Sequence, residues 1–233
     1  MSLYKIAGVT VEMTPHYPTL TRQSEAYRCD LSDEAQMKLL LPESYIADKQ
    51  RQNPHLSMDD CEYIWYGFEF YRRLPFFGGI MLHSSCIAVD GKAYMFSAPC
   101  GTGKSTHTML WKRYFGDRAV YINDDKPALC VRGDTAYACG TPFSGKTDLN
   151  TNLTVPVGGI CILERGEQNE LHRLTAKNAL PRFMNQTFRP ADPTGMVKTL
   201  EILDALFSVV PIYELHCDMS EDAVLTSYNG MNR

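Results

Sequence analysis

The spacing of apolar residues along the first 77 positions predicts three short strands and one helix. Apolar runs bounded by turn residues are typical of antiparallel strands. Such runs occur at residues 6–11, 27–30 and 37–41. Ser57 and Asp60 form a Ser-x-x-Asp helix start, which precedes an aromatic-rich stretch at residues 61–74. That stretch is either a helix packed on the core or an aromatic binding face.

The pattern after Gly78 mixes strands and helices without strict alternation. Asp90-Gly91 lies between two apolar runs and predicts a hairpin turn. Further strands are expected at residues 119–122, 126–131, 136–139, 159–163 and 212–217, and helices at residues 104–115, 176–186 and 193–207 and from Ser220 onward. We therefore expect an α/β protein with a mixed sheet flanked by helices. Residues 1–77 would form a strand and helix extension packed on a core of residues 78–233.

Length, charge and cysteine spacing narrow the class of protein. The chain has 233 residues, enough for one large domain or for a medium domain with an appendage. A net charge of −4 gives no electrostatic basis for binding nucleic acid or an anionic membrane. No apolar run approaches the ~20 residues of a membrane span, and the first residues lack the apolar block of a signal peptide. None of the eight cysteines forms a C-x-x-C pair, so we expect a cytoplasmic protein without a zinc site.

The clearest chemical signal is a glycine-rich segment between an expected strand and an expected helix. Its sequence is Ala98-Pro99-Cys100-Gly101-Thr102-Gly103-Lys104-Ser105-Thr106. It fits the phosphate-loop pattern G-x-x-x-x-G-K-[ST], with alanine in place of the first glycine. Glycines let backbone N–H groups surround a phosphate, and the positive end of the following helix attracts the anion. The segment predicts a nucleotide site; the alternative is a glycine-rich helix cap with an incidental lysine.

Individual side chains of this loop have expected roles at a bound nucleotide. Lys104 is expected to contact the β- and γ-phosphates, and the Ser105 hydroxyl to take one position on Mg²⁺. Thr106 and the backbone from Cys100 to Gly103 would add phosphate contacts. The Cys100 thiol is either redox-sensitive or simply a small group that the loop tolerates.

A second signal is the strand expected at residues 119–122, which is followed by Asn123, Asp124 and Asp125. In a mononucleotide-binding unit, the end of this strand lies beside the phosphates. One carboxylate can hold Mg²⁺ while the other accepts the proton of an attacking hydroxyl. Neighbouring residues of a strand point to opposite sides, so Asp124 and Asp125 should have different roles. The alternative is a solvated turn.

Two further segments carry candidate anion contacts. A second glycine-rich loop has the sequence Gly140-Thr141-Pro142-Phe143-Ser144-Gly145-Lys146. In this loop, Lys146 either contacts a phosphate or belongs to an ordinary turn. Arg189 lies between two expected helices, where it either clamps the transferred phosphoryl group or is a surface arginine.

With these motifs, the chain resembles the superfamily of HPr kinase/phosphorylases and ATP-dependent phosphoenolpyruvate carboxykinases. The resemblance rests on the phosphate loop, on the strand that ends in Asp124-Asp125, and on two strings, Asn-Asp-Asp-Lys-Pro-Ala-Leu and Gly-Thr-Pro-Phe-Ser-Gly-Lys. The strings are similar to those of small bacterial HPr-kinase-like proteins, and the resemblance covers about residues 78–217. It implies a P-loop core with the mixed sheet of that superfamily, and ATP and Mg²⁺ as ligands. It also implies that Asp124 or Asp125 is the catalytic base and metal partner.

The resemblance also gives His83 a role. This histidine precedes Lys104 by 21 residues, where HPr kinases have a histidine near the transferred phosphoryl group. Without the resemblance, His83 could equally be a hydrogen-bonded core residue. The chain is expected to depart from the family at a glutamate metal ligand in a Leu-Glu-x-Arg-Gly segment, in whose place we find Gly140-Thr141-Pro142. Residues 1–77 do not resemble the oxaloacetate-binding domain of carboxykinases, so decarboxylating activity is not expected.

These signals together predict an ATP- and Mg²⁺-dependent phosphotransferase. Its acceptor would be a hydroxyl group, most simply that of serine, on a protein, a peptide or a small molecule. The alternative is a non-catalytic ATP-binding accessory or regulatory module of a peptide-modification or metabolic system. A third candidate is a phosphorylase that runs the reverse reaction. The sequence does not determine the acceptor, the preferred nucleobase of the nucleotide (adenine or guanine) or the oligomeric state.

Overall fold

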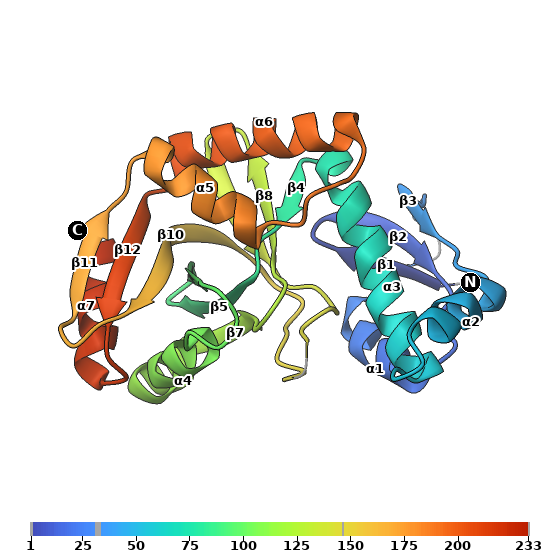
Figure 1. Cartoon of the computed structure of the whole chain (residues 1–233), viewed down its shortest axis with the longest axis horizontal. Helices are drawn as coiled ribbons and strands as arrows, with labels where there is room; N and C mark the ends of the chain where they lie inside the picture. Colours follow the sequence, from blue (N-terminus) through green and yellow to red (C-terminus); the bar gives the residue numbers. More distant parts are fainter. Residues whose placement is uncertain (1, 31–33, 146, 233) are drawn as a thin grey trace.

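The computed structural model describes residues 2–30, 34–145 and 147–232, and its strands form two sheets (Figure 1). The smaller sheet contains β1 (Ser2–Ile6), β2 (Val9–Met13) and β3 (Met37–Leu39). β1 and β2 pair antiparallel, whereas β3 lies parallel to β2.

The prediction of three antiparallel strands in this part is wrong. The apolar run at residues 6–11 turns back on itself at Ala7-Gly8, where both residues have positive φ. The run at residues 27–30 is not a strand, because Tyr27 ends a 3-10 helix and only Arg28 forms a bridge, to Tyr4. A short apolar run with a turn inside it has the same composition as a single strand, so periodicity did not distinguish them.

Three helices belong to the same part of the molecule: α1 (Pro18–Ser24), α2 (Glu43–Gln52) and α3 (Met58–Arg73). The predicted start of α3 is confirmed, because Ser57 and Asp60 form a complete capping box. Tyr66, Phe70 and Tyr71 of α3 are buried against the small sheet and the neighbouring core. The aromatic stretch is therefore a core helix along this face. A 3-10 turn (Leu74–Phe77) leads from α3 into the larger sheet.

The larger sheet is mixed, as predicted. Its strands are β4 (Gly79–Met81), β5 (Ser84–Val89), β6 (Lys92–Ser97), β7 (Ala119–Asn123), β8 (Ala128–Arg132), β9 (Thr135–Cys139), β10 (Thr154–Arg165), β11 (Glu170–Arg173) and β12 (Ile212–Cys217). They run in the order β4-β8-β9-β10-β6-β5-β7, and β12 and then β11 extend from β10. β10 is parallel to β6 and β12, and the other pairs are antiparallel.

Helices cover both faces of this sheet. α5 (Ala176–Gln186) and α6 (Pro193–Val209) bury one apolar cluster against it, and α4 (Lys104–Phe115) and α7 (Glu221–Met231) bury another (Figure 1). A third cluster joins the small sheet and α3 to β8, β9 and Phe143. Among the described residues, no helix has both the length and the hydropathy of a membrane span.

Candidate functional site

The glycine-rich segment forms a tight loop between β6 and α4. β6 ends at Ser97 and α4 begins at Lys104, which confirms the predicted helix from residue 104 to residue 115. Gly101 has a φ of +80° and Gly103 a φ of +121°. An L-residue with a side chain rarely adopts either value, so the loop needs glycine at both positions.

The start of α4 has the features of an anion site. Its N-cap is Gly103, and no side chain caps the first turn. The first N–H groups of a helix have no partner within the helix, and the helix dipole makes this end positive. Ser105 is exposed and Thr106 half-buried beside these groups, and Cys100 is exposed in the preceding loop.

Lys104 lies folded back on its own loop. Its Nζ atom donates to the carbonyl oxygens of Ala98 at 2.9 Å and Pro99 at 3.4 Å, and the residue is buried. Burial lowers the pKa of Lys104, while the negative charges of Asp125 and Asp124 act in the opposite sense. Both carboxylates are therefore close enough to Lys104 to influence its charge.

Asp124 follows β7 and is buried beside α4. Ser85 donates a short hydrogen bond to its Oδ1 atom, and the Ser85 hydroxyl also contacts Thr108 Oγ1 of α4 at 2.6 Å. The Oδ2 atom is buried and has no hydrogen-bond partner among the described residues. Leaving a buried carboxylate oxygen unpaired is costly, and a cation that binds it would remove that cost.

Asp125, the next residue, has different surroundings. Its Oδ1 lies 3.3 Å from His83 Nε2, and its Oδ2 pairs with the Lys126 ammonium. Burial by itself would raise the pKa of Asp125, but hydrogen bonds and charge from His83 and Lys126 lower it to about 2. The carboxylate is thus ionised and oriented at neutral pH, as a group that accepts a hydroxyl proton must be.

His83 joins two segments that are distant in sequence. Its Nδ1 atom lies 2.8 Å from Gln186 Oε1, and its backbone N–H donates to the Gln186 carbonyl at 2.7 Å. Gln186 ends α5, whereas His83 lies between β4 and β5. The ring is therefore held between Gln186 on one side and Asp125 on the other.

The second glycine-rich loop packs against Asn123 and Asp125. Asn123 Nδ2 donates to the Thr141 carbonyl at 3.0 Å. Gly145 has a φ of +66°, and a Cβ atom at this position would lie 2.6 Å from Asp125 Oδ2. The backbone thus approaches the Asp125 carboxylate as closely as only glycine allows. Lys146, for which a phosphate contact was predicted, lies outside the described residues.

Arg189 follows α5 in the segment that leads to α6. It is exposed and follows Phe188, whose N–H donates to the Met81 carbonyl. Within residues 2–30, 34–145 and 147–232, no hydrogen bond or ion pair joins Arg189 to His83 or to either aspartate. A phosphoryl clamp at Arg189 stays a prediction.

Glu164 and Arg165 were missed at the sequence level. They end β10 within Leu163-Glu164-Arg165-Gly166, which is one residue shorter than the family's Leu-Glu-x-Arg-Gly segment. β10 is parallel to β6, and Ile162 pairs with Ser97, so the two strands end at the same edge. Arg165 Nη2 donates to the Gly101 carbonyl at 2.6 Å, inside the phosphate loop. The sequence pattern that could have identified Glu164 and Arg165 is a long apolar strand that ends in charged residues and glycine.

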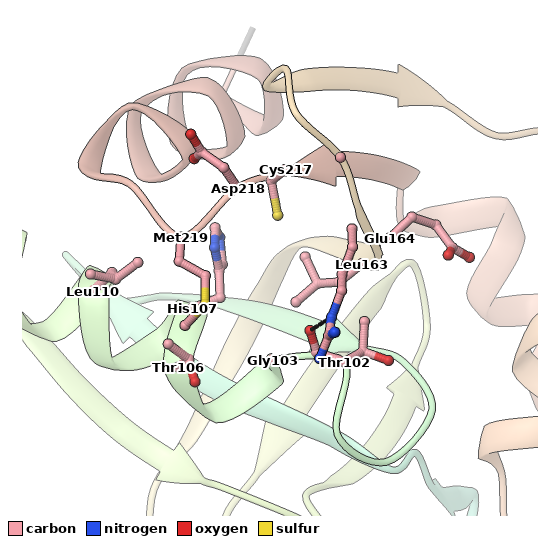
Figure 2. Close-up of a pocket in the computed structure, with 12 residues that line it drawn as sticks. Thr102, Gly103, Thr106, His107, Leu110, Leu163, Glu164, Cys217, Asp218 and Met219 are labelled. Carbon is pink, nitrogen blue, oxygen red and sulfur yellow. Dashed lines mark hydrogen bonds between the residues drawn. The ribbon is translucent and has the colours of Figure 1, made fainter.

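A cavity of about 410 Å³ adjoins the phosphate loop. Its lining residues are Thr102, Gly103, Thr106, His107 and Leu110 of the loop and α4, Leu163 to Gly166 at the end of β10, and Cys217 to Met219 at the end of β12. Figure 2 shows the loop residues on one side, with Cys217 and Met219 facing them across the cavity. Burial lowers the pKa of His107 to about 4, so this ring is neutral. The cavity combines apolar side chains with access to the phosphate loop, as a nucleoside site requires.

Comparisons with known proteins add little to this geometry. No family model matches the sequence, and no curated protein matches it. Among solved structures, the fold is distantly similar to the HPr(Ser) kinase/phosphatase from Coxiella burnetii, with a TM-score of 0.38 and 10% sequence identity. The match covers 66% of this chain and 99% of that one. A similarity this distant shows neither the family nor the activity, so the function has to be inferred from the site.

Proposed function

We propose that this protein is an ATP- and Mg²⁺-dependent phosphotransferase that moves the γ-phosphoryl group to a hydroxyl group. The observation that carries the proposal is the pair of adjacent carboxylates beside the phosphate loop. Asp124 has a buried oxygen with no partner in the described part of the chain, and Asp125 is held ionised by His83 and Lys126. A phosphate-binding helix start next to one metal-binding and one proton-accepting carboxylate is what phosphoryl transfer needs.

The nucleotide is proposed to bind across the start of α4. Its phosphates would lie against the loop from Cys100 to Thr106, and the nucleoside would occupy the cavity of about 410 Å³ beside it (Figure 2). Lys104 would exchange its bonds to the Ala98 and Pro99 carbonyls for bonds to the β- and γ-phosphates. Arg165 would hold the loop through the Gly101 carbonyl.

The residues present fit a magnesium ion that also binds phosphate oxygens. In the described parts of the chain, no three His, Cys, Asp or Glu side chains gather to form a metal site by themselves. Asp124, through its unpaired Oδ2, and the exposed Ser105 hydroxyl would hold the ion together with the nucleotide. Bound there, Mg²⁺ would neutralise negative charge on the phosphates.

In the proposed transfer step, Asp125 accepts the proton of the acceptor hydroxyl. The acceptor oxygen forms a bond to the γ-phosphorus, and the bond from that phosphorus to the β–γ bridging oxygen breaks, which releases ADP. The hydroxyl proton passes to the Asp125 carboxylate, whose position His83 and Lys126 fix. His83 is thus a positioning residue in this proposal, and Lys104 stabilises charge on the transferred group.

Calorimetric titration of Mg-ATP, with phosphoryl transfer followed in the same samples, tests the proposal. Lys104→Ala should abolish binding, whereas Asp125→Asn should bind ATP and lose at least about a hundredfold in transfer rate. Asp124→Asn should weaken Mg-ATP binding more than binding of metal-free ATP. Asp134→Asn, which changes an exposed turn aspartate, is the matched control and should behave like the wild type.

One result would favour the accessory module instead. If the wild type and Asp125→Asn bind Mg-ATP equally and neither transfers phosphate to any acceptor in a cell lysate, the protein binds nucleotide without catalysis. Thermal melting of each variant separates this result from a folding defect.

A further inference from the structure

A second cavity, of about 260 Å³, lies between α3 and the segments that hold Asp125. Its wall is apolar and mostly aromatic. The lining residues are Tyr63, Ile64, Gly67, Phe68 and Tyr71 of α3, and Met81, Lys126, Phe143 and Phe188 of the segments opposite. Nothing in the nucleotide site accounts for this cavity, because none of these residues lines the phosphate loop or the cavity beside it.

The walls opposite α3 are the direct neighbours of the proposed catalytic groups. Lys126 follows Asp125 and pairs with its carboxylate. Met81 precedes His83 by two positions, and Phe188 follows Gln186 by two. The Phe188 N–H donates to the Met81 carbonyl at 3.3 Å. Both residues therefore belong to the two paired segments that also hold His83. A molecule that fills the cavity therefore contacts Lys126, the ion-pair partner of Asp125.

Features of α3 make the cavity narrow and apolar. Gly67 lies in the middle of this helix, where glycine costs about 0.5–1 kcal/mol relative to alanine. A Cβ atom there would lie 3.0 Å from Phe143 Cδ1, so glycine lets the Phe143 ring approach the helix. The hydroxyl groups of Tyr63 and Tyr71 bond to Pro142 and Thr141 of the second glycine-rich loop. Their polar atoms are thus already satisfied, which leaves ring surface for an occupant.

The size of the cavity and its charge limit what can bind there. At about 260 Å³ it is smaller than the ~300–1,000 Å³ of pockets that hold a whole ligand, so it accommodates one side group. Among the described lining residues, Lys126 alone is charged, and Asp125 already neutralises it. A charged side group would lose its hydration there without gaining a partner.

The apolar surface continues outside the cavity. Ile64 and Phe68, one helical turn apart on α3, are 43% and 44% exposed. The Phe68 ring lies 5.2 Å from the Phe188 ring, measured between centroids, so this surface is continuous with the cavity wall. The surface at the mouth extends the contact beyond one side group, which favours an acceptor that is a chain rather than a small alcohol.

We infer that this cavity selects the acceptor, and that the acceptor is a peptide with an aromatic or large aliphatic residue next to its hydroxyl residue. The apolar side chain fills the cavity, and the adjacent hydroxyl reaches Asp125. The inference rests on the proposed function, because it assigns the second substrate of that same site. It gives part of residues 1–77 a function in substrate choice, since α3 supplies five of the nine lining residues.

Short peptides test the inference directly. The probes are acetyl-Phe-Ser-amide and acetyl-Ser-Phe-amide, their alanine counterparts, and 2-phenylethanol as a free aromatic alcohol. In the wild type, one of the two phenylalanine peptides should be phosphorylated with kcat/KM at least about tenfold above its alanine counterpart. Phe68→Gln and Ile64→Gln should remove that preference and leave the KM for ATP unchanged. Met109→Gln, which changes an exposed apolar residue of α4, is the matched control and should keep the preference.

Two outcomes would overturn the inference while the phosphotransferase proposal stands. Equal use of the phenylalanine and alanine peptides would show that the cavity does not select the acceptor. Equal use of 2-phenylethanol and the better peptide would show that the acceptor is not a chain. NMR saturation transfer to the phenylalanine ring separates the two proposals. The wild type could show saturation transfer that Phe68→Gln abolishes and yet phosphorylate no peptide. That result would support peptide binding in the cavity and contradict the proposed phosphotransferase activity.

Discussion

At the scale of single residues, neighbours decide what two adjacent aspartates can do. Asp124 is linked to α4 through Ser85 and has one oxygen without a partner among the described residues, whereas Asp125 bonds to His83 and Lys126. An aspartate side chain is therefore suited to bind a cation at position 124 and to accept a proton at position 125. Both are ordinary carboxylates in the sequence, so their difference arises from the folded surroundings.

The environment of Asp125 predicts a pH dependence of stability. Its pKa falls from 3.8 to about 2 on folding. Its ionised form therefore stabilises the protein above pH 3.8, and this contribution is lost as the pH falls through about 2. Urea unfolding between pH 2 and pH 6 should show a stability difference between wild type and Asp125→Asn that shrinks toward acid. His83→Gln should show a weaker pH dependence than the wild type; a difference that stays constant with pH would contradict the role of this ion pair.

A second prediction concerns the glycine that packs on Asp125. In Gly145→Ala, the new Cβ atom would lie 2.6 Å from Asp125 Oδ2, so the carboxylate must move. We expect loss of phosphoryl transfer with Mg-ATP binding retained. Gly133→Ala is the control, because Gly133 has a similar φ of +56° but open space around it. It should lose only about 1–2 kcal/mol of stability from backbone strain. Equal transfer rates in both variants would show that the approach of Gly145 is unimportant.

At the scale of elements, α3 is attached to the site by its tyrosines. The Tyr71 hydroxyl bonds to the Lys126 carbonyl and lies 2.7 Å from Thr141 Oγ1. The Tyr63 hydroxyl accepts from the Ser144 N–H at 2.8 Å. One helix thus holds both the residue after Asp125 and the loop that packs on it.

These contacts predict the effect of removing one hydroxyl. Tyr71→Phe keeps the ring in the core but removes two buried hydrogen bonds, which should cost about 1–3 kcal/mol of unfolding free energy. Tyr114→Phe, which changes a tyrosine that is 42% exposed on α4, should have almost no effect. Urea denaturation of the two variants measures the difference. Equal midpoints would mean that α3 is held by apolar packing alone.

At the scale of the whole molecule, the two sheets share an apolar core. One cluster contains Tyr4, Ile6 and Val11 of the small sheet together with Cys130, Cys139 and Phe143 of the larger part. Arg132, the last residue of β8, also donates to the Ala7 carbonyl at 3.3 Å. Separating residues 1–77 from the remainder would expose this cluster to water.

The shared core predicts a single unfolding transition. We propose that residues 1–77 are an extension that folds together with residues 78–233, not an independent domain. Scanning calorimetry should therefore give one peak, with equal calorimetric and van't Hoff enthalpies. Two resolved peaks, or a stable fragment of residues 78–233 with an unchanged melting temperature, would contradict this arrangement.

The sequence by itself determined the features that depend on neighbouring residues. The glycines of the phosphate loop, the start of α4 at Lys104, the capping box of α3 and the Asp90-Gly91 hairpin are all where the local pattern predicts them. Each of these depends on backbone conformation or on hydrogen bonds within a few positions, which residue type largely controls. The turn at Ala7-Gly8 was missed because it lies within an apolar run that has no other turn residues and therefore resembles one strand.

Only the tertiary structure decided which distant residues meet. The parallel pairing of β6 with β10 brings Arg165 to Gly101, and the pairing of Leu82 with Thr187 brings Gln186 to His83. The cavity beside Asp125 likewise exists only because α3 packs against β4 and Phe188. Strand order and helix packing minimise the exposed apolar surface of the whole chain. This total area cannot be inferred from any local sequence pattern. Residue types therefore specified the chemistry available at the site, and long-range packing specified which groups share it.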